Sequence, residues 1–185
     1  MLILHSMTDF TAPGCVVALG TFDGVHLGHA HLIQTACALA REKNLPAAAL
    51  TFDRHPLSLI RPDAVPAALT PLPEKERLLA ALGLDILIEQ PFTAAFAAQE
   101  ADAFLESLCA ALRPAAVVIG YNHTFGRRGL GSAALLESRA QTLGCEAVVL
   151  PPFEMDGEPV SSTRIRALLA NGQRSEAERL AGHPL

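Results

Sequence analysis

Two histidines with two residues between them stand where an apolar run gives way to a helical pattern. The run 15–19 ends at Gly20, and His26-Leu27-Gly28-His29 opens the helical pattern that follows. The unpaired amides and the dipole of a helix start attract anions. Because residues three apart in a helix share a face, both imidazoles can reach the same anion. The stretch from Ala18 to Leu32 therefore predicts a nucleotide-phosphate site.

A second candidate for anion binding lies far along the chain, in the sequence V-S-S-T-R-I-R at 160–166. Its hydroxyls can cap the amides of a helix start, and its two arginines add fixed positive charge. Charge-assisted bonds of this kind can hold a polyphosphate or a pyrophosphate leaving group. From these residues alone, an ordinary capped helix with solvated arginines explains the pattern equally well.

Apolar runs of strand length alternate with helical patterns along the chain. The predicted strands are 16–20, 47–52, 85–89, 115–120 and 146–150, and the predicted helices between them are 29–43, 74–82, 101–112 and 132–143. The strands are continuous hydrophobic runs, which are typical of a parallel sheet buried on both faces. The alternation predicts a doubly wound α/β fold, with a parallel five-stranded sheet and helices on both faces. The length of 185 residues fits a single domain over 1–185.

A hairpin and two further helices are expected after the fifth strand. Asp156-Gly157 is a hairpin-type turn. The helices are predicted at 163–170 and 175–181, and Ser175 with Glu178 fits a capping box for the second. The segment 61–73 carries four prolines (Pro62, Pro66, Pro71 and Pro73), so it is predicted to be a surface loop.

Polar clusters follow four of the predicted strands, at 21–23, 51–56, 120–129 and 160–166. In open α/β sheets, ligands bind outside the carboxyl ends of the strands. The clusters therefore predict a single site at that edge. Within it, Asp23 can orient a histidine or cap a turn.

Charge and composition count against several classes of function. The net charge is −5 and no Lys/Arg tract occurs, so nucleic-acid binding is disfavoured. No signal peptide and no membrane span is predicted. The four cysteines are widely spaced without a C-x-x-C pair, which favours reduced thiols in the cytoplasm. His26, His29 and His31 lack the spacing of a zinc motif, so no metal ligands are predicted among them. His5 and His183 are expected in solvent.

The two anion-binding stretches together resemble the H-x-G-H and S-S-T-x-x-R pair of the nucleotidylyltransferase superfamily. The words G-T-F-D-G-V-H-L-G-H, T-F-D-R-H-P and G-Y-N-H-T-F-G narrow the resemblance. With them the chain resembles the N-terminal FMN adenylyltransferase module of bifunctional bacterial FAD synthetases. This resemblance implies a Rossmann-like, nucleotidylyltransferase-like fold and the reaction ATP + FMN → FAD + pyrophosphate in the cytoplasm. The family continues into a riboflavin kinase domain, and 180–185 fall about where the link to that domain would begin. Flavokinase activity is therefore expected to be absent.

The same resemblance assigns roles to individual residues. Catalysis would fall to His26, His29 and Arg166. The residues that would bind ATP and its phosphates are Gly20, Thr21, Phe22, Gly28, Ser161, Ser162, Thr163 and Arg164. Those that would bind the flavin are Phe52, His55, Pro56, Asn122 and Thr124. At Asn122-His123 the chain departs from the acidic-aromatic or Asn-aromatic pair of many members. Magnesium would accompany ATP with few protein ligands.

Two other functions remain open from the sequence. The acceptor could be another small phosphate ester, which the T-F-D-R-H-P and G-Y-N-H-T-F-G words disfavour. The chain could also be a non-catalytic flavin- or nucleotide-binding module, although the intact phosphate motifs speak against loss of activity. Arg127 and Arg128, in a glycine-flanked loop, could close over a substrate or be a solvated basic loop.

Overall fold

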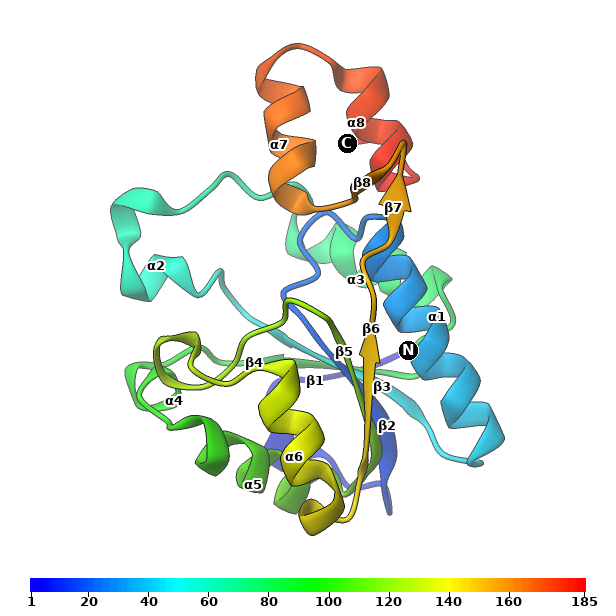
Figure 1. Cartoon of the computed structure of the whole chain (residues 1–185), viewed down its shortest axis with the longest axis vertical. Helices are drawn as coiled ribbons and strands as arrows, with labels where there is room; N and C mark the ends of the chain where they lie inside the picture. The colour runs from blue at the N-terminus through cyan, green and yellow to red at the C-terminus, as the bar shows by residue number, and fades with distance from the viewer.

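Six parallel strands form the centre of the computed structural model, which describes residues 1–185 (Figure 1). They are β1 (Leu2–Leu4), β2 (Cys15–Leu19), β3 (Ala47–Phe52), β4 (Ile86–Gln90), β5 (Pro114–Gly120) and β6 (Glu146–Leu150). Their order in the sheet is β1-β4-β3-β2-β5-β6. Every neighbouring pair is parallel. The doubly wound α/β fold predicted from the sequence is confirmed.

The prediction of five strands was wrong because β1 was missed. The five predicted strands are all present, with ends within one residue of those expected. β1 is only three residues long and pairs with β4 alone, where Leu2 lies opposite Ile86. A run of that length carries no periodic signal, and its exposed edge gives it no continuous burial. Tertiary pairing with β4 is what makes it a strand.

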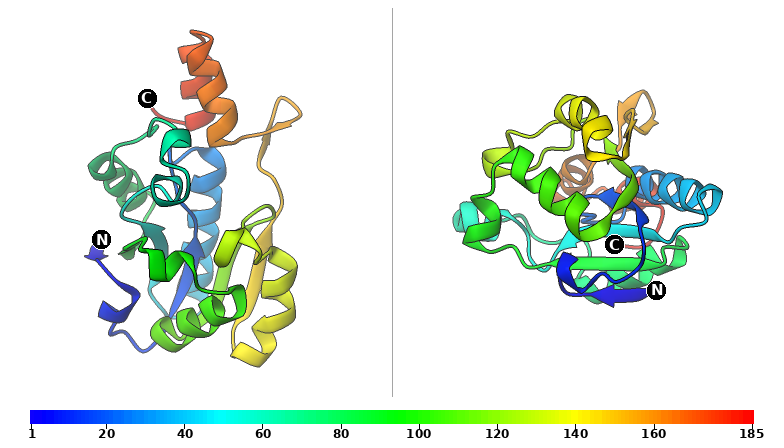
Figure 2. Two further views of the ribbon diagram at one scale, coloured as in Figure 1. Left: turned by 90° about the vertical axis from the view of Figure 1, so that its left-hand side faces the viewer. Right: turned by 90° about the horizontal axis from the view of Figure 1, so that it is seen from below.

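Helices cover both faces of the sheet (Figures 1 and 2). α5 (Ala101–Leu112) and α6 (Ala133–Leu143) pack on one face, where Leu105, Leu108 and Leu136 are fully buried with β2 and β5. α1 (Leu27–Glu42) and α3 (Leu72–Ala81) pack on the other, where Ile33 and Leu79 are fully buried. No helix combines the length and apolar character needed to cross a membrane.

Short helical segments connect the main elements. They are α2 (Leu57–Ile60), α4 (Ala94–Ala97) and three 3₁₀ turns, Met7–Asp9, Pro62–Ala64 and Arg127–Gly129. The segment 61–73 contains one of these turns and the first two residues of α3. Only its middle part is the irregular surface loop that the prolines predict, because Pro is compatible with the first turn of a helix.

A hairpin and two helices lie beyond the carboxyl edge of the sheet, at the top of Figure 1. β7 (Glu154–Met155) and β8 (Glu158–Pro159) are joined through Asp156 and Gly157, whose φ angles are 59° and 76°. Positive φ at both central residues is what a two-residue hairpin turn needs, as predicted. α7 (Ser162–Ala170) and α8 (Arg174–Ala181) pack on each other through Ile165 and Leu180.

The capping box predicted for α8 is wrong. The helix begins at Arg174, one residue before Ser175, and its N-cap residue, Gln173, makes no side-chain cap bond. Glu178 instead accepts a hydrogen bond from Arg174 Nε at 2.9 Å. Arg174 and Glu178 both lie inside the helix, so Glu178 forms an i,i+4 ion pair there and not a capping box with Ser175.

The chain reverses its direction across the sheet at β2. It leaves β2 towards β3 and β4 on one side and returns to β5 and β6 on the other. Such a switch point leaves a crevice outside the carboxyl ends of the two central strands, where ligands of open α/β sheets bind. In this chain those strands are β2 and β5.

Truncating Leu105 to alanine is expected to lower the free energy of unfolding by about 2–5 kcal/mol, because this side chain of α5 is fully buried in the core. Urea denaturation followed by circular dichroism measures the change. The matched control is Leu130→Ala, since Leu130 is 70% exposed and its loss should cost less than about 0.5 kcal/mol. Equal effects at the two positions would contradict the packing described here.

Candidate active site

The loop between β2 and α1 (residues 20–25, the β2–α1 loop) has a strained backbone. Phe22 and Val25 have φ angles of 49° and 31°, although neither is glycine. Positive φ is rare for non-glycine residues and a real outlier for a β-branched one. Both side chains are buried, so the surrounding structure imposes the conformation. Backbone strain of this kind gathers at ligand sites, where it holds the chain ready for binding.

His26 and His29 form a stacked pair at the start of α1. Their ring centroids lie 3.6 Å apart with an interplanar angle of 14°. His26 is the N-cap residue, and its Nδ1 accepts a hydrogen bond from the His29 N–H at 3.2 Å. A side chain at Gly28 would bring a Cβ within 3.2 Å of the His26 ring. In the H-x-G-H motif, the first histidine caps the helix, the glycine leaves room for its ring, and the second histidine stacks on that ring.

Both imidazoles are held neutral in this structure. Burial lowers the pKa of His26 to about 4, against smaller opposing effects of its own backbone hydrogen bond and of Asp23. Burial also places the pKa of His29 well below its usual value, helped by His26 and by Lys75. Because His26 accepts at Nδ1, its neutral form carries the proton on Nε2. Nδ1 of His29 is buried without a partner, while the ring packs edge-on against Phe22 at 5.4 Å.

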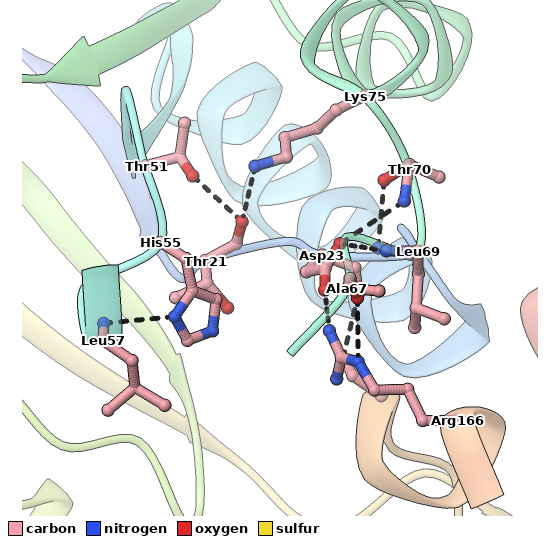
Figure 3. Close-up of polar contacts among 12 residues, drawn as sticks. Thr21, Asp23, Thr51, His55, Leu57, Ala67, Leu69, Thr70, Lys75 and Arg166 are labelled. Carbon is pink, nitrogen blue, oxygen red and sulfur yellow. Dashed lines mark hydrogen bonds and ion pairs between the residues drawn. The ribbon is translucent and has the colours of Figure 1, made fainter. Parts of the chain in front are cut away.

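The second predicted anion-binding stretch begins α7 and contacts the β2–α1 loop directly. Ser161 is the N-cap and accepts the Arg164 N–H at 3.2 Å. The Ser162 hydroxyl donates to the carbonyl oxygen of Asp23 at 2.9 Å. The Arg166 guanidinium forms an ion pair with the Asp23 carboxylate and donates from Nε to the Ala67 carbonyl at 3.1 Å (Figure 3). The fold therefore brings together the two stretches that the sequence separates.

Asp23 links three segments of the chain at this point. Its Oδ1 accepts the N–H groups of Leu69 and Thr70 at 2.9 and 3.4 Å, and its Oδ2 pairs with Arg166. It therefore caps the turn at 69–70, one of the two roles left open by the sequence. His183, expected in solvent, is half-buried, and its Nε2 lies 2.8 Å from the carbonyl oxygen of the adjoining Gly24.

Arg164 does not share the position of Arg166. Its guanidinium donates to the carbonyl oxygens of Met155 and Glu158, both at 3.1 Å, and pairs with the Glu158 carboxylate at 3.3 Å. These contacts fasten the hairpin to α7. Nothing in this placement supports the phosphate-binding role that the resemblance assigned to Arg164. Thr163 is exposed at the first turn of α7.

A cavity of about 450 Å³ opens beside His29, between the ends of β2 and β5. Its lining includes Gly20, Thr21, Phe22 and His29 from the predicted phosphate site and Phe52, Pro56, Asn122 and Thr124 from the predicted flavin set. Further aromatic walls come from Phe92, Phe96, Phe104 and Phe125. Phe52 packs edge-on against Phe92 at 4.9 Å and Phe96 at 5.7 Å. Flat rings on several sides suit a flat, largely apolar ligand.

A second cavity, of about 300 Å³, shares Thr21, Phe52 and Pro56 with the first. His55, predicted among the flavin residues, lines this second cavity and not the aromatic one. Its Nδ1 accepts the Leu57 N–H at 3.1 Å. Burial lowers the pKa of His55, and the positive charges of Arg166 and Lys75 act in the same direction, against Asp23.

The comparisons with known proteins agree with this geometry. A family model described as FAD synthetase matches residues 9–164, which include the β2–α1 loop, the cavity walls and the start of α7. This chain belongs to the FAD synthetase family.

Two relatives show how far the similarity extends. Over 182 residues the chain is 36% identical to the bifunctional riboflavin kinase/FMN adenylyltransferase of Escherichia coli strain K12, covering 98% of this chain and 58% of that protein. It is also 36% identical over 190 residues to a putative bifunctional riboflavin kinase/FMN adenylyltransferase of Geobacillus thermodenitrificans, covering 100% of this chain and 99% of that protein. The chain thus spans a little over half the length of relatives such as the Escherichia coli protein.

Two crystal structures resemble this FAD synthetase family member in three dimensions. The macrolide-efflux protein from Streptococcus pneumoniae superimposes with a TM-score of 0.88 at 31% identity, covering 100% of this chain and 62% of that one. Pantothenate synthetase from Thermus thermophilus superimposes with a TM-score of 0.57 at 17% identity, covering 98% and 81%. The second likeness shows the fold alone, and it agrees with the nucleotidylyltransferase-like fold expected from the sequence.

Further residues of this FAD synthetase family member line the two cavities. Phe92 precedes α4 and Phe96 lies within it, and their ring centroids are 6.0 Å apart; neither residue belongs to a motif in the sequence. Of the two arginines in the glycine-flanked loop, Arg128 lines the aromatic cavity, whereas Arg127 pairs with Glu100 at 2.9 Å. Lys75 lines the second cavity and had no motif around it. Only the fold brings α3 beside the β2–α1 loop.

Acidification from pH 7 to pH 4 is expected to destabilise the ligand-free protein. In the unfolded chain His26 takes up a proton near pH 6.5, whereas in the folded chain its pKa is about 4. The unfolded state therefore binds more protons between these values, and stability falls as the pH falls, by up to about 3 kcal/mol from His26 alone. Chemical denaturation at a series of pH values measures the slope.

The variant His26→Asn keeps a side-chain acceptor for the helix cap and removes the titrating ring, so it should flatten that slope. His31→Asn is the matched control, because His31 is exposed on the same helix and should leave the slope unchanged. A slope that survives His26→Asn in full would show that His26 is not the buried neutral group described here.

Proposed function

We propose that this chain transfers the adenylyl group of ATP to FMN, forming FAD and releasing pyrophosphate. The observation that carries the proposal is the direct contact between the two anion-binding stretches beside an aromatic cavity, in a member of the FAD synthetase family. Two helix starts that can bind anions at the carboxyl edge of the sheet suit a polyphosphate. The adjoining cavity, lined by aromatic rings, suits a flavin ring. The site thus offers neighbouring places for both substrates.

The reaction needs no nucleophile from the protein. An oxygen of the FMN phosphate attacks the α-phosphorus of ATP, the bond from that phosphorus to the bridging oxygen breaks, and pyrophosphate leaves with the bonding electrons. Catalysis of such a transfer consists mainly of positioning and of stabilising charge. The backbone amides of the β2–α1 loop and of the start of α1 would contact the phosphates of ATP. The rings of His26 and His29 would contact the same phosphates. Arg166 and the hydroxyls of Ser162 and Thr163 would hold the departing pyrophosphate.

Magnesium enters the proposal together with ATP. The chain gathers no group of three or more His, Cys, Asp and Glu side chains that could cage a metal ion. Magnesium usually keeps several waters and binds through substrate phosphates, so this donor set fits an ion carried by the nucleotide. Such an ion would neutralise phosphate charge at the site.

The proposal extends to the organisation and location of the protein. We assign the adenylyl transfer to the domain that residues 1–185 form. Small-molecule substrates and four free cysteines fit the cytoplasm. An acceptor other than a flavin is the alternative, and the aromatic cavity favours the flavin.

The deciding experiment supplies the purified protein with MgATP and either FMN or riboflavin and follows products by chromatography. FAD is expected from FMN, and riboflavin serves as the control acceptor because it lacks the phosphate oxygen that would attack ATP. Pyrophosphate release with other phosphate esters tests the alternative acceptor. Tight FMN or FAD binding by a folded protein without turnover would instead identify a non-catalytic binding module.

The variant His29→Ala should lower kcat about 100-fold or more, because the ring lines the cavity beside the strained loop and would stabilise charge in the transition state. His31→Ala is the control on the same helix, since His31 faces Phe153 at 5.7 Å and not the cavity. Comparable kcat values for the two variants would remove His29 from the mechanism.

The variant Phe92→Ala should raise the KM for FMN about tenfold and leave the KM for ATP within about twofold, because it removes one wall of the aromatic cavity. Steady-state kinetics with each substrate varied in turn gives both constants, and the ATP constant is the internal control. Equal increases in both constants would mean that the cavity does not distinguish the flavin.

A further inference from the structure

The buried face of α3 carries an ammonium group that the proposed mechanism does not use. Lys75 is half-buried and lines the second cavity. Its Nζ donates to the carbonyl oxygen of Thr21 at 2.9 Å (Figure 3). The Thr51 hydroxyl, at the end of β3, donates to the same oxygen at 3.1 Å. A carbonyl oxygen has two lone pairs, so these two donors satisfy it completely.

The bonded carbonyl belongs to the peptide that enters the strained part of the β2–α1 loop. Thr21 immediately precedes Phe22, the first residue of the loop with positive φ. The Phe22 ring is fully buried and packs against His29. Strained conformations persist only where the surroundings determine them. The two donors to Thr21 hold the carbonyl group of the peptide that directly precedes Phe22.

Charged groups from every neighbouring element face Lys75. Asp23 in the loop and Glu89 at the end of β4 are the negative ones, and they oppose the effect of burial, which lowers the pKa of Lys75. His29 on α1 and His55 after β3 both lie within its electrostatic reach, since its charge lowers the pKa of each. Arg166 approaches from α7, on the other side of Asp23. Lys75 is therefore a cation beside the β2–α1 loop, with charged or titratable groups of five other segments around it.

We propose that Lys75 is a positioning residue: by holding the Thr21 carbonyl, it keeps the β2–α1 loop in the conformation that presents Phe22 and His29 to the nucleotide. This inference rests on the proposed adenylyl transfer. Lys75 acts through the loop and not on the reacting atoms. Thr51 shares the task, because it bonds the same oxygen.

Kinetics of Lys75→Met, Thr51→Val and the double variant test this role. Lys75→Met keeps the length of the side chain but removes its charge and its donors. It should lower kcat about 10- to 100-fold, as expected for a small displacement of a catalytic group, with the KM for FMN within about twofold of the wild-type value. Lys75→Arg, which keeps a donor and a charge, should recover most of the loss. The double variant should lose less than the product of the single losses, because both act through one carbonyl oxygen.

The control variant is Arg77→Met, which removes a cation from the same helix. Arg77 is bonded only to Glu74 at the surface, so its loss should leave kcat unchanged. Thermal unfolding of every variant shows whether each is folded at the assay temperature. Unchanged kcat in folded Lys75→Met, or purely multiplicative losses in the double variant, would overturn the proposal.

A spectroscopic measurement on the unmutated protein completes the test without relying on turnover. The chain has only two lysines, Lys43 and Lys75, so ¹³C-labelling of lysine side chains gives one signal for each. Lys43 lies at the end of α1 and pairs with Glu146 at 3.1 Å. Adding the magnesium complex of α,β-methylene-ATP, which cannot transfer its adenylyl group, should shift the Lys75 signal and leave the Lys43 signal in place.

The two measurements separate the inference from the function on which it rests. If the wild-type protein makes no FAD but the Lys75 signal shifts, the proposed reaction is wrong and the contact between Lys75 and the nucleotide-binding loop still holds. If FAD forms and the Lys75 signal does not respond to the nucleotide analogue, the reaction stands and the positioning role of Lys75 is wrong.

Discussion

The buried carboxylate of Asp23 is the group on which the rest of the site depends. It is 7% exposed, and a charge so deeply placed requires partners that replace water. It finds them in two amides of the 69–70 turn and in the guanidinium of Arg166, while its own carbonyl accepts the Ser162 hydroxyl. Removing one partner of such a group leaves an uncompensated charge, which costs about 3–5 kcal/mol. Asp23 therefore joins the loop, the turn and α7, together with the bonds from the Gly24 N–H to the Thr70 hydroxyl and from Arg166 Nε to the Ala67 carbonyl oxygen.

This arrangement also sets the charge of the site before any ligand binds. The carboxylates of Asp23 and Glu89 lie among the cations of Lys75 and Arg166, and the stacked imidazoles add no charge because burial keeps them neutral. Phosphate groups entering the site would compete with Asp23 for Arg166. Their negative charge would also favour the protonated form of nearby imidazoles. The proposed binding of a polyphosphate would therefore change the partners of Arg166 and the protonation of the rings together.

The sequence predicted those parts of the molecule that depend on local patterns. Continuous apolar runs identified five of the strands. The H-L-G-H and S-S-T-R-I-R sequences identified the starts of α1 and α7, because the residues that cap a helix are neighbours in the sequence. β1 was missed because three residues form a strand only when β4 offers them an edge. Lys75 was missed for the same kind of reason, since its partner Thr21 lies 54 residues earlier and no local spacing connects them.

The aromatic cavity shows most clearly which parts of the site cannot be predicted from local sequence. Phe52 ends β3, Phe92 and Phe96 lie in the segment around α4, and Phe125 follows β5, so no window of sequence contains the whole wall. Each ring by itself is an ordinary apolar residue that a core would bury. They form one cavity wall because the segments that follow β3, β4 and β5 all leave the sheet at the same edge and leave a cavity between them. The shape of the proposed flavin site therefore depends on the strand order, whereas the proposed phosphate contacts lie in the β2–α1 loop and at the start of α7.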